Sequence, residues 1–163
     1  MAEAAPRLVA HRGYPARFPE NTLEGITAAL KTGVRYVEFD VQLSGDGVPV
    51  VLHDPDLSRT AGAPVKVFDT TLAELRRYPV GEPARFGDRY SDARLPALAE
   101  VLTLLGGRPG VQAFVEIKRH ALRRFGRAFV LEAVLKVLSP YRDQCIIISF
   151  DRKLVEMAKA ASA

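Results

Sequence analysis

The chain has 163 residues, of which 48% are hydrophobic and 26% are charged, an ordinary composition for one folded domain spanning residues 1–163. The net charge is +4, but the basic residues are scattered without an aromatic platform or zinc-finger spacing, so nucleic acid is not an expected partner. No secretory signal pattern and no run of about 18 apolar residues are present, which predicts no membrane span and a cytoplasmic location. Cys145, the one cysteine, is expected to be a buried, inert thiol.

Apolar runs and helical patterns alternate along the chain. The predicted strands are residues 8–11, 36–41, 48–53, 111–118 and 145–150. The predicted helices are residues 21–33, 71–77, 96–105, 121–138 and 152–161. In the first helix Asn21 is the expected cap and Gly33 the stop signal, while residues 79–96 are expected to form a loop. This alternation predicts a mostly parallel α/β fold.

The run VEFDVQLSGDGVPVVLHD carries ionisable groups inside an otherwise apolar segment. Its Asp46-Gly47 pair is typical of a two-residue type I′ hairpin turn, which would place His53 directly opposite Asp40. That position is a non-hydrogen-bonded pair, where side chains approach most closely. Glu38 lies on the same face as Asp40, because side chains alternate along a strand. Three ionisable groups are therefore expected to converge.

Further groups near other predicted strand ends extend this cluster. Two carboxylates on one strand face suit a hard cation such as Mg²⁺ or Ca²⁺ if other oxygen ligands join them, and Glu116 is the natural third ligand. Lys118 lies two residues on, on the same face. The first strand ends in His11, which can exchange a proton, and Arg12, which can bind phosphate through several donors. The set predicts phosphoryl chemistry.

Several of these residues also have a purely structural interpretation. Asp54 could bond to the backbone where the strand ends, Asn21 is more typical of a helix cap than of a ligand, and Glu20 would favour the positive end of that helix. Glu116 and Lys118 could form an ordinary surface pair. His120 and Asp151 have only a structural interpretation.

Together, the segments HRGYPARFPENT, VEFDVQLSGDGVPVVLHDPDLSRTAG and VEIK resemble the glycerophosphodiester phosphodiesterase family, from about residue 8 to 151. The resemblance implies a (β/α)8 TIM-type barrel with its site at the carboxyl ends of the strands. It implies hydrolysis of a glycerophosphodiester to glycerol 3-phosphate and an alcohol. It leaves open which histidine is the acid, and whether water or the substrate's own hydroxyl attacks first. The implied roles are an acid/base pair of His11 and His53, one divalent cation (Mg or Ca) on Glu38, Asp40 and Glu116, and phosphate contacts from Arg12 and Lys118.

The length departs from this family pattern, because such barrels need about 250 residues and only about five of eight strands are predicted here. We therefore expect a C-terminally truncated, incomplete barrel whose open edges a second copy of the chain could cover. Two other functions stay open: a noncatalytic phosphodiester-binding or assembly fragment, and a phospholyase resembling sphingomyelinase D. The sequence PENT after HRG weighs against the phospholyase.

Overall fold

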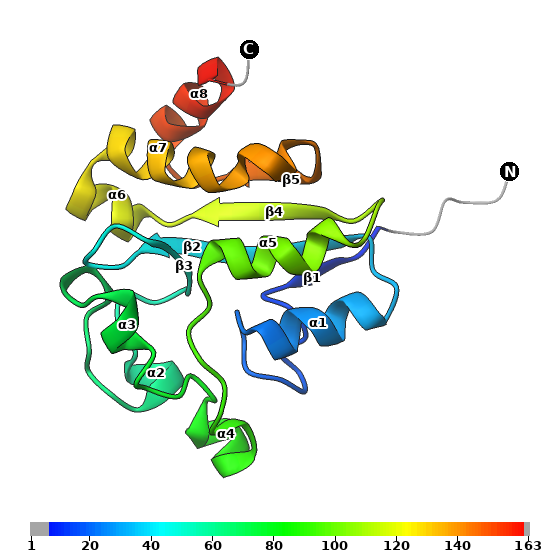
Figure 1. The fold of residues 1–163 in the computed structure, drawn as a ribbon, viewed down its shortest axis with the longest axis vertical. Helices are drawn as coiled ribbons and strands as arrows, with labels where there is room; N and C mark the ends of the chain where they lie inside the picture. Colours follow the sequence, from blue (N-terminus) through cyan, green and yellow to red (C-terminus); the bar gives the residue numbers. More distant parts are fainter. Residues whose placement is uncertain (1–6, 162–163) are drawn as a thin grey trace, which may run out of the picture.

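The computed structural model describes residues 7–161, which form an α/β structure around one five-stranded sheet (Figure 1). The strands are β1 (Val9–His11), β2 (Tyr36–Leu43), β3 (Pro49–Val51), β4 (Gln112–Ile117) and β5 (Cys145–Ile148). Four of them are parallel, in the spatial order β1-β2-β4-β5, and β3 pairs antiparallel with β2. All five predicted strands and the mostly parallel sheet are confirmed.

Helices follow the strands and cover one face of the sheet. The longer ones are α1 (Leu23–Lys31), α5 (Leu98–Gly106), α6 (Arg119–Phe125), α7 (Arg127–Leu138) and α8 (Arg152–Ala161). Shorter pieces between β3 and α5 are α2 (Ser58–Ala61), η1 (Val67–Asp69), α3 (Leu72–Leu75), α4 (Pro83–Phe86) and η2 (Gly87–Tyr90), and η3 (Ser139–Gln144) precedes β5. The segment 79–96, predicted as loop, therefore contains one helical turn and one 3₁₀ turn.

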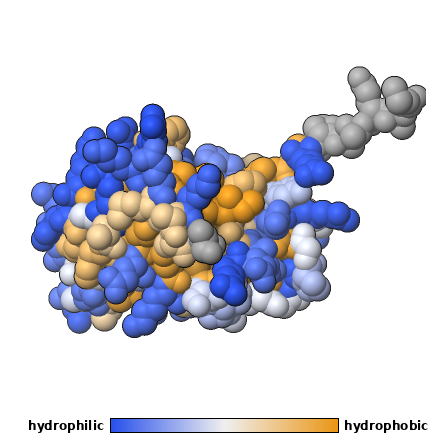
Figure 2. All heavy atoms as spheres, turned by 90° about the horizontal axis from the view of Figure 1, so that it is seen from above, coloured by the Kyte–Doolittle hydropathy of each residue, from blue (hydrophilic) through white to orange (hydrophobic). Residues whose placement is uncertain are grey.

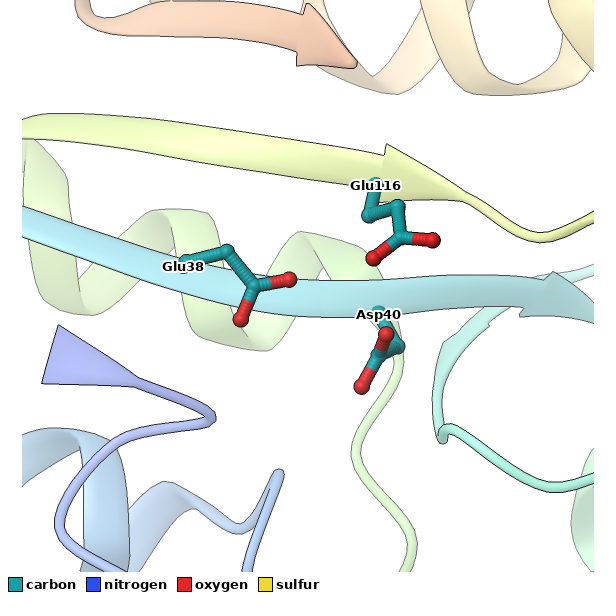
Figure 3. Close-up of side chains that lie close together, drawn as sticks. All are labelled: Glu38, Asp40 and Glu116. Carbon is teal, nitrogen blue, oxygen red and sulfur yellow. The ribbon is translucent and has the colours of Figure 1, made fainter. Parts of the chain in front are cut away.

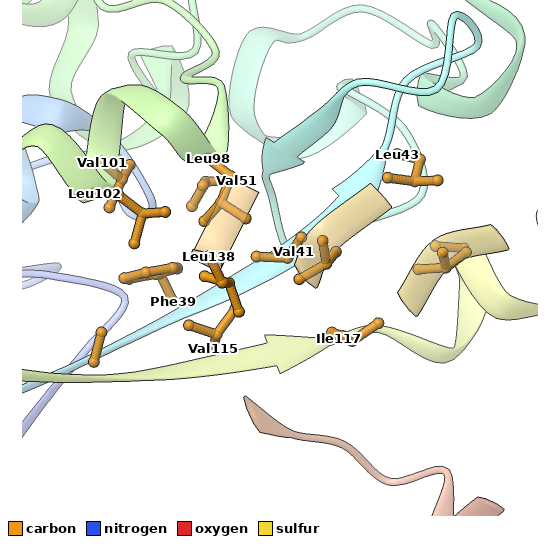
Figure 4. Close-up of a cluster of buried hydrophobic side chains, with 14 of the residues drawn as sticks. Phe39, Val41, Leu43, Val51, Leu98, Val101, Leu102, Val115, Ile117 and Leu138 are labelled. Atoms are coloured by element: carbon orange, nitrogen blue, oxygen red, sulfur yellow. The ribbon is translucent and has the colours of Figure 1, made fainter. Parts of the chain in front are cut away.

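The alternation of side chains along β2 separates the core from the polar face of the sheet. Phe39 and Val41 are fully buried and pack with Leu102 of α5 and Val115 of β4 in the main hydrophobic cluster (Figure 4). The residues between them on the strand must point to the opposite face. Asp40 is among these, so the helices that cover one side leave the other side to polar groups.

The first helix begins one residue later than predicted. Thr22, not Asn21, is its N-cap, because the Thr22 hydroxyl accepts a hydrogen bond from the backbone N–H of Gly25 at 3.1 Å. Asn21 has a left-handed backbone with φ of 55° and is buried. The predicted stop is confirmed, since Gly33 follows the end of α1 with φ of 84°.

The predicted helix 121–138 is two helices, because Gly126 interrupts it. Gly126 has φ of 83° and ψ of 152°, a conformation that is open to glycine but not helical. The chain changes direction there. Arg127 at the start of α7 forms a bidentate ion pair with Asp151, with two hydrogen bonds of 2.8 Å each. Asp151 also caps α8 by accepting the N–H of Leu154, so its structural interpretation fits.

The predicted hairpin register is wrong by one residue. Val41 pairs with Val51, and the N–H of Leu52 donates to the Asp40 carbonyl, so Leu52 takes the place predicted for His53. The reason is a longer turn. The Ser44 N–H donates to the Val48 carbonyl at 3.0 Å, and the Ser44 hydroxyl bonds to the Asp46 carboxylate and to the backbone of residue 48, which leaves a three-residue turn, 45–47, instead of a two-residue one.

The segment between β3 and α5 has a small core of its own. Its buried side chains are Val50, Leu52, Leu57, Val67, Leu75, Val80, Ala93 and Leu95. This second cluster fixes α2 beside the polar face of β2. The position matters because α2 and the residues just before it carry charged side chains that reach the site described below.

The sheet is not closed into a full barrel. Among residues 7–161, β1 and β5 have no strand partner on their outer sides, and exposed apolar residues lie at both edges, including Val9 (46% exposed) and Ile146 (39%). Figure 2 shows apolar surface between charged side chains on the face that bears α8.

Cys145 on β5 is half-buried, and burial raises the pKa of its thiol to about 11, as expected for an inert cysteine. No helix within the described range is long and apolar enough to cross a bilayer.

Candidate active site

Three carboxylates meet on the polar face of the two central strands (Figure 3). Glu38 and Asp40 lie two residues apart on β2 and therefore share a face. Glu116 on β4 is the direct register partner of Asp40. One oxygen atom from each of the three side chains lies within 4.8 Å of the other two. The structure thus brings together the three residues predicted as metal ligands, with Asp40 completely buried.

The carboxyl group of Glu38 has a raised pKa. Burial, followed by the negative charges of Asp40 and Glu116, raises its pKa to about 7. The backbone N–H of Arg12 donates to Glu38 Oε2 at 3.2 Å and opposes the shift without cancelling it. The other oxygen, Oε1, is buried and has no hydrogen-bond partner within the described part of the chain. One ligand position of the cluster is therefore unsatisfied.

Two cations lie against Asp40. Lys118 Nζ is 2.9 Å from Glu116 Oε1 and 3.2 Å from Asp40 Oδ1, while Arg12 Nε is 3.2 Å from Asp40 Oδ2. Burial lowers the pKa of Lys118, but its contacts with Glu116 and Asp40 outweigh burial and leave the pKa above its ordinary value. Glu116 and Lys118 thus form a pair, and it lies within the cluster instead of on an ordinary solvated surface.

Asn21 is a site residue that the sequence prediction missed. Its side-chain amide donates to Asp40 Oδ2 at 2.8 Å, and its Oδ1 accepts the N–H of Asp40 at 3.3 Å. This two-way contact holds the Asp40 carboxylate in a fixed orientation. The available signal was Thr22, an equally good helix cap next in the sequence, which leaves Asn21 free for another role.

The two histidines approach the site from different elements. His11 ends β1, is the register partner of Glu38, and places Nε2 3.6 Å from Glu38 Oε2. His53 follows β3, and its Nδ1 is 2.7 Å from Asp54 Oδ1. Because of the register difference in the hairpin, His53 does not lie opposite Asp40. Its connection to the carboxylates runs through other residues.

A chain of ion pairs makes this connection. Asp54 accepts from Arg59 Nε at 2.7 Å, and Arg59 Nη2 donates to Glu20 Oε1 at 2.6 Å. Glu20 in turn accepts from Arg12 Nη1 at 3.2 Å. The sequence left the role of Asp54 open, suggested a local structural role for Glu20 and did not single out Arg59. Their contacts join residues that are distant in sequence, which no local pattern indicates.

Comparison with known proteins assigns the chain to a family. The sequence model of the glycerophosphoryl diester phosphodiesterase family matches residues 11–162. The chain belongs to this family. The resemblance inferred from the sequence motifs is thereby confirmed, and with it the parallel α/β architecture as an incomplete form of the family's barrel.

Relatives of this family align with most of the chain. A glycerophosphodiester phosphodiesterase of Caldanaerobacter subterraneus subsp. tengcongensis is 34% identical over 146 residues, which cover 88% of this chain and 58% of that protein. The structure of an Oleispira antarctica phosphodiesterase in complex with its product sn-glycerol-3-phosphate matches with a TM-score of 0.83 at 32% identity, covering 96% of this chain and 62% of that one. The glycerophosphodiester phosphodiesterase of Thermotoga maritima gives 0.74 at 32% identity, covering 96% and 60%. The chain spans about three-fifths of the length of these relatives.

Proposed function

We propose that this chain is a metal-dependent phosphoric diester hydrolase that cleaves glycerophosphodiesters to glycerol 3-phosphate and an alcohol. The observation that carries the proposal is the buried cluster of Glu38, Asp40 and Glu116, flanked by two cations and by His11. The Oleispira antarctica phosphodiesterase, which binds sn-glycerol-3-phosphate as its product, supports this choice of substrate class. The proposal covers the whole reaction, although the chain spans about three-fifths of the length of its relatives.

The charges of the site fit one divalent cation. When ionised, the carboxylates exceed the fixed cations by two charges, as the five acids Glu20, Glu38, Asp40, Asp54 and Glu116 face the three bases Arg12, Arg59 and Lys118. The donors of the central cluster are all oxygen atoms, which suits Mg²⁺ or Ca²⁺, and the unpartnered Oε1 of Glu38 is available as a ligand. When bound, the cation would stabilise negative charge that develops on the phosphate during the reaction.

Arg12 and Lys118 are the residues we assign to the phosphate. Both are held by Asp40, yet each has further donors, because a guanidinium offers five N–H groups and an ammonium three. These donors would bind the non-bridging phosphate oxygens and orient the diester in the site. Neither cation needs to leave Asp40 to do so.

His11 and His53 are the residues we assign to proton transfer. The His11 side chain is 64% exposed and that of His53 is 32% exposed, so both can reach a substrate in the open site. One imidazole accepts a proton from the attacking oxygen, and the other donates a proton to the departing alcohol oxygen. Such general acid/base catalysis typically contributes about 10² to 10⁴ in rate.

The decisive experiment is to incubate the folded chain with glycerophosphocholine in the presence of Mg²⁺ or Ca²⁺ and to measure glycerol 3-phosphate with a coupled dehydrogenase assay. We expect product that requires the cation and disappears with EDTA. The control variant is Arg152→Met on α8, which removes an exposed ion pair with Glu156 away from the site and should keep full activity.

Other outcomes of the same experiment separate the alternative functions. Binding of the diester and the cation without product would indicate a noncatalytic phosphodiester-binding fragment, an alternative that the three-fifths coverage of the relatives favours. A cyclic phosphate as the final product would indicate a phospholyase. Absence of both binding and product from the folded chain would contradict the hydrolase.

Three further expectations stay predictions. The chain as one domain over residues 1–163 would be tested by a single cooperative unfolding transition. The cytoplasmic location would be tested by cell fractionation. The proposed partner, a second copy of the chain, would cover the open edges at β1 and β5, and a mass that rises with concentration would support it.

A further inference from the structure

Arg59 on α2 contacts two carboxylates that come from distant parts of the chain. Its Nε donates to Asp54 at 2.7 Å and its Nη2 donates to Glu20 at 2.6 Å. The side chain of Arg59 is 44% exposed, whereas those of Asp54 and Glu20 are 23% and 9% exposed. Contacts to both carboxylates raise the pKa of Arg59 above its ordinary value. Arg59 is therefore a fixed positive charge between two largely buried acids.

Arg59 thus bridges Asp54 and Glu20. The Asp54 end of this bridge determines which nitrogen of His53 carries the proton. Asp54 Oδ2 is occupied by Arg59, and Oδ1 lies 2.7 Å from His53 Nδ1. Burial raises the pKa of Asp54, but hydrogen bonds and charges from Arg59 and His53 outweigh burial, so the pKa is lowered and Asp54 is ionised at neutral pH. An ionised carboxylate only accepts hydrogen bonds, so Nδ1 must be the protonated nitrogen and Nε2 is left for the substrate.

The Glu20 end of the bridge fixes Arg12. Glu20 Oε1 accepts from Arg12 Nη1 at 3.2 Å, and the other side of the Arg12 guanidinium faces Asp40. Glu20 itself is anchored, because its backbone N–H donates to Glu82 at 2.6 Å. Burial raises the pKa of Glu20, but Arg59 and Arg12 outweigh burial and lower it, so this carboxylate is also ionised.

We propose that Arg59 is a positioning residue that couples the two functional ends of the site. Through Asp54 it keeps His53 in the form with Nδ1 protonated, and through Glu20 it holds Arg12 where a phosphate would bind. The catalytic consequence rests on the proposed function, but the coupling is a property of this chain and exists without turnover. Lysine could not replace Arg59, because one ammonium lacks the planar fork that contacts two carboxylates at fixed angles.

The test is a nuclear magnetic resonance experiment on the ¹⁵N-labelled chain at about pH 8, where an ordinary histidine is neutral. The sequence has three histidines, so long-range ¹H–¹⁵N spectra are simple, and His53 is assigned by the loss of its signals in His53→Ala. The Nε–H signal of Arg12 is assigned in the same way with Arg12→Lys. Each signal reports one end of the bridge.

We expect His53 to be mainly the Nδ1–H form in the original chain. In Arg59→Met the Asp54 carboxylate stays ionised but loses the contact that holds its Oδ2, so the share of the Nδ1–H form should fall, and the Arg12 Nε–H signal should shift and broaden. Arg59→Lys should restore neither signal fully. Arg152→Met, which removes an arginine–carboxylate pair of similar length (2.8 Å) on exposed α8, should leave both signals unchanged.

Two more variants separate the ends of the bridge and guard against misfolding of Arg59→Met. Asp54→Ala should change the His53 form strongly and the Arg12 signal only slightly, whereas Glu20→Gln should do the reverse. Unchanged His53 and Arg12 signals in folded Arg59→Met, or in both single-end variants, would overturn the proposal. If the chain proves inactive on glycerophosphocholine, the hydrolase proposal fails while these spectra still decide the coupling.

Discussion

Among residues 7–161, no lysine or arginine side chain forms an ion pair with Glu38, unlike its two neighbours in the cluster. Its ion-pair partner within the described residues is the imidazole of His11, whereas Asp40 and Glu116 contact Lys118. Burial, together with the charges of Asp40 and Glu116, raises the pKa of Glu38 to about 7, above the ordinary 4.5 that it would have in the unfolded chain. The folded state holds a proton that the unfolded state has already lost, so the contribution of Glu38 to stability falls as pH rises from 4.5 to about 7.

The same shift predicts how metal affinity depends on pH. A cation must displace the proton of Glu38, so affinity should increase about tenfold between pH 6 and pH 8 and level off above the pKa. Calorimetric titration with Mg²⁺ or Ca²⁺ at several pH values measures this. Glu38→Gln should bind more weakly and lose most of the pH dependence. An equally steep dependence in that variant would assign the effect to another group.

A second prediction separates the residues proposed as metal ligands from those proposed for proton transfer. Asp40→Asn keeps the shape of the side chain but removes a charge from the cluster, so metal affinity should fall by at least about tenfold. His53→Ala should leave metal affinity nearly intact and abolish turnover, because the His53 contact is with Asp54 and not with the cluster. Calorimetry and the glycerol 3-phosphate assay measure the two effects. Equal metal affinity in both variants would contradict the assignment.

At the scale of elements, β1 and α1 are joined by a contact between backbones. Gly13 has φ of 90°, and a Cβ atom there would lie 2.7 Å from the backbone carbon of Gly25 in α1. Arg12, just before it, is also left-handed, with φ of 56°. Non-glycine residues in this conformation are uncommon and occur at functional sites that the surrounding fold stabilises. The close approach at Gly13 is part of that stabilisation.

Gly13→Ala should therefore destabilise the protein by more than about 2 kcal/mol, because alanine adds both backbone strain and a clash with backbone atoms. Urea unfolding measures the change. Gly107→Ala is the matched control, since Gly107 has φ of −86° and, apart from its two sequence neighbours, no described residue has an atom within 4 Å of the added Cβ, so stability should change little. Similar losses in both variants would show that the Gly13–Gly25 contact is unimportant.

Elements were predictable from sequence where a local rule decides them, and unpredictable where a distant contact does. Gly33 ends α1 as predicted, because a left-handed glycine is a strong local stop signal. The hairpin was misjudged because the Ser44 hydroxyl, which binds Asp46, selects a longer turn than Asp-Gly alone implies. Asn21 was misassigned because its partner Asp40 is on another element. The carboxylate cluster itself was predictable, since parallel strands bring their carboxyl ends to one side of the sheet.

At the scale of the whole molecule, the two ends of the sheet are open within residues 7–161. The β5 edge carries Ile146, and an apolar groove beside it is lined by Leu135, Leu138, Ile147 and Val155. Unpaired strand edges with apolar side chains favour association with another chain. This supports the proposed second copy as the partner that covers them.

We expect the apparent mass of the chain to rise with concentration in sedimentation velocity experiments. Ile146→Lys should lower the mass toward that of a monomer, because a charge at a strand edge opposes pairing. Lys153→Met on α8 changes charge without touching a strand and serves as the comparison. A mass that stays monomeric at every concentration would contradict the oligomer.

The register of Asp40 with Glu116 has a consequence for assembly of the protein. These residues come from strands that are neighbours in the sheet but far apart along the chain, so the oxygen cluster cannot exist before β2 and β4 have docked. An ion bound there would link β2 and β4 across the middle of the sheet. Because it binds the native arrangement and not the disordered chain, it would favour folding by mass action. The concentration of the ion would then set the fraction of the chain that is folded, in addition to its proposed role in the reaction.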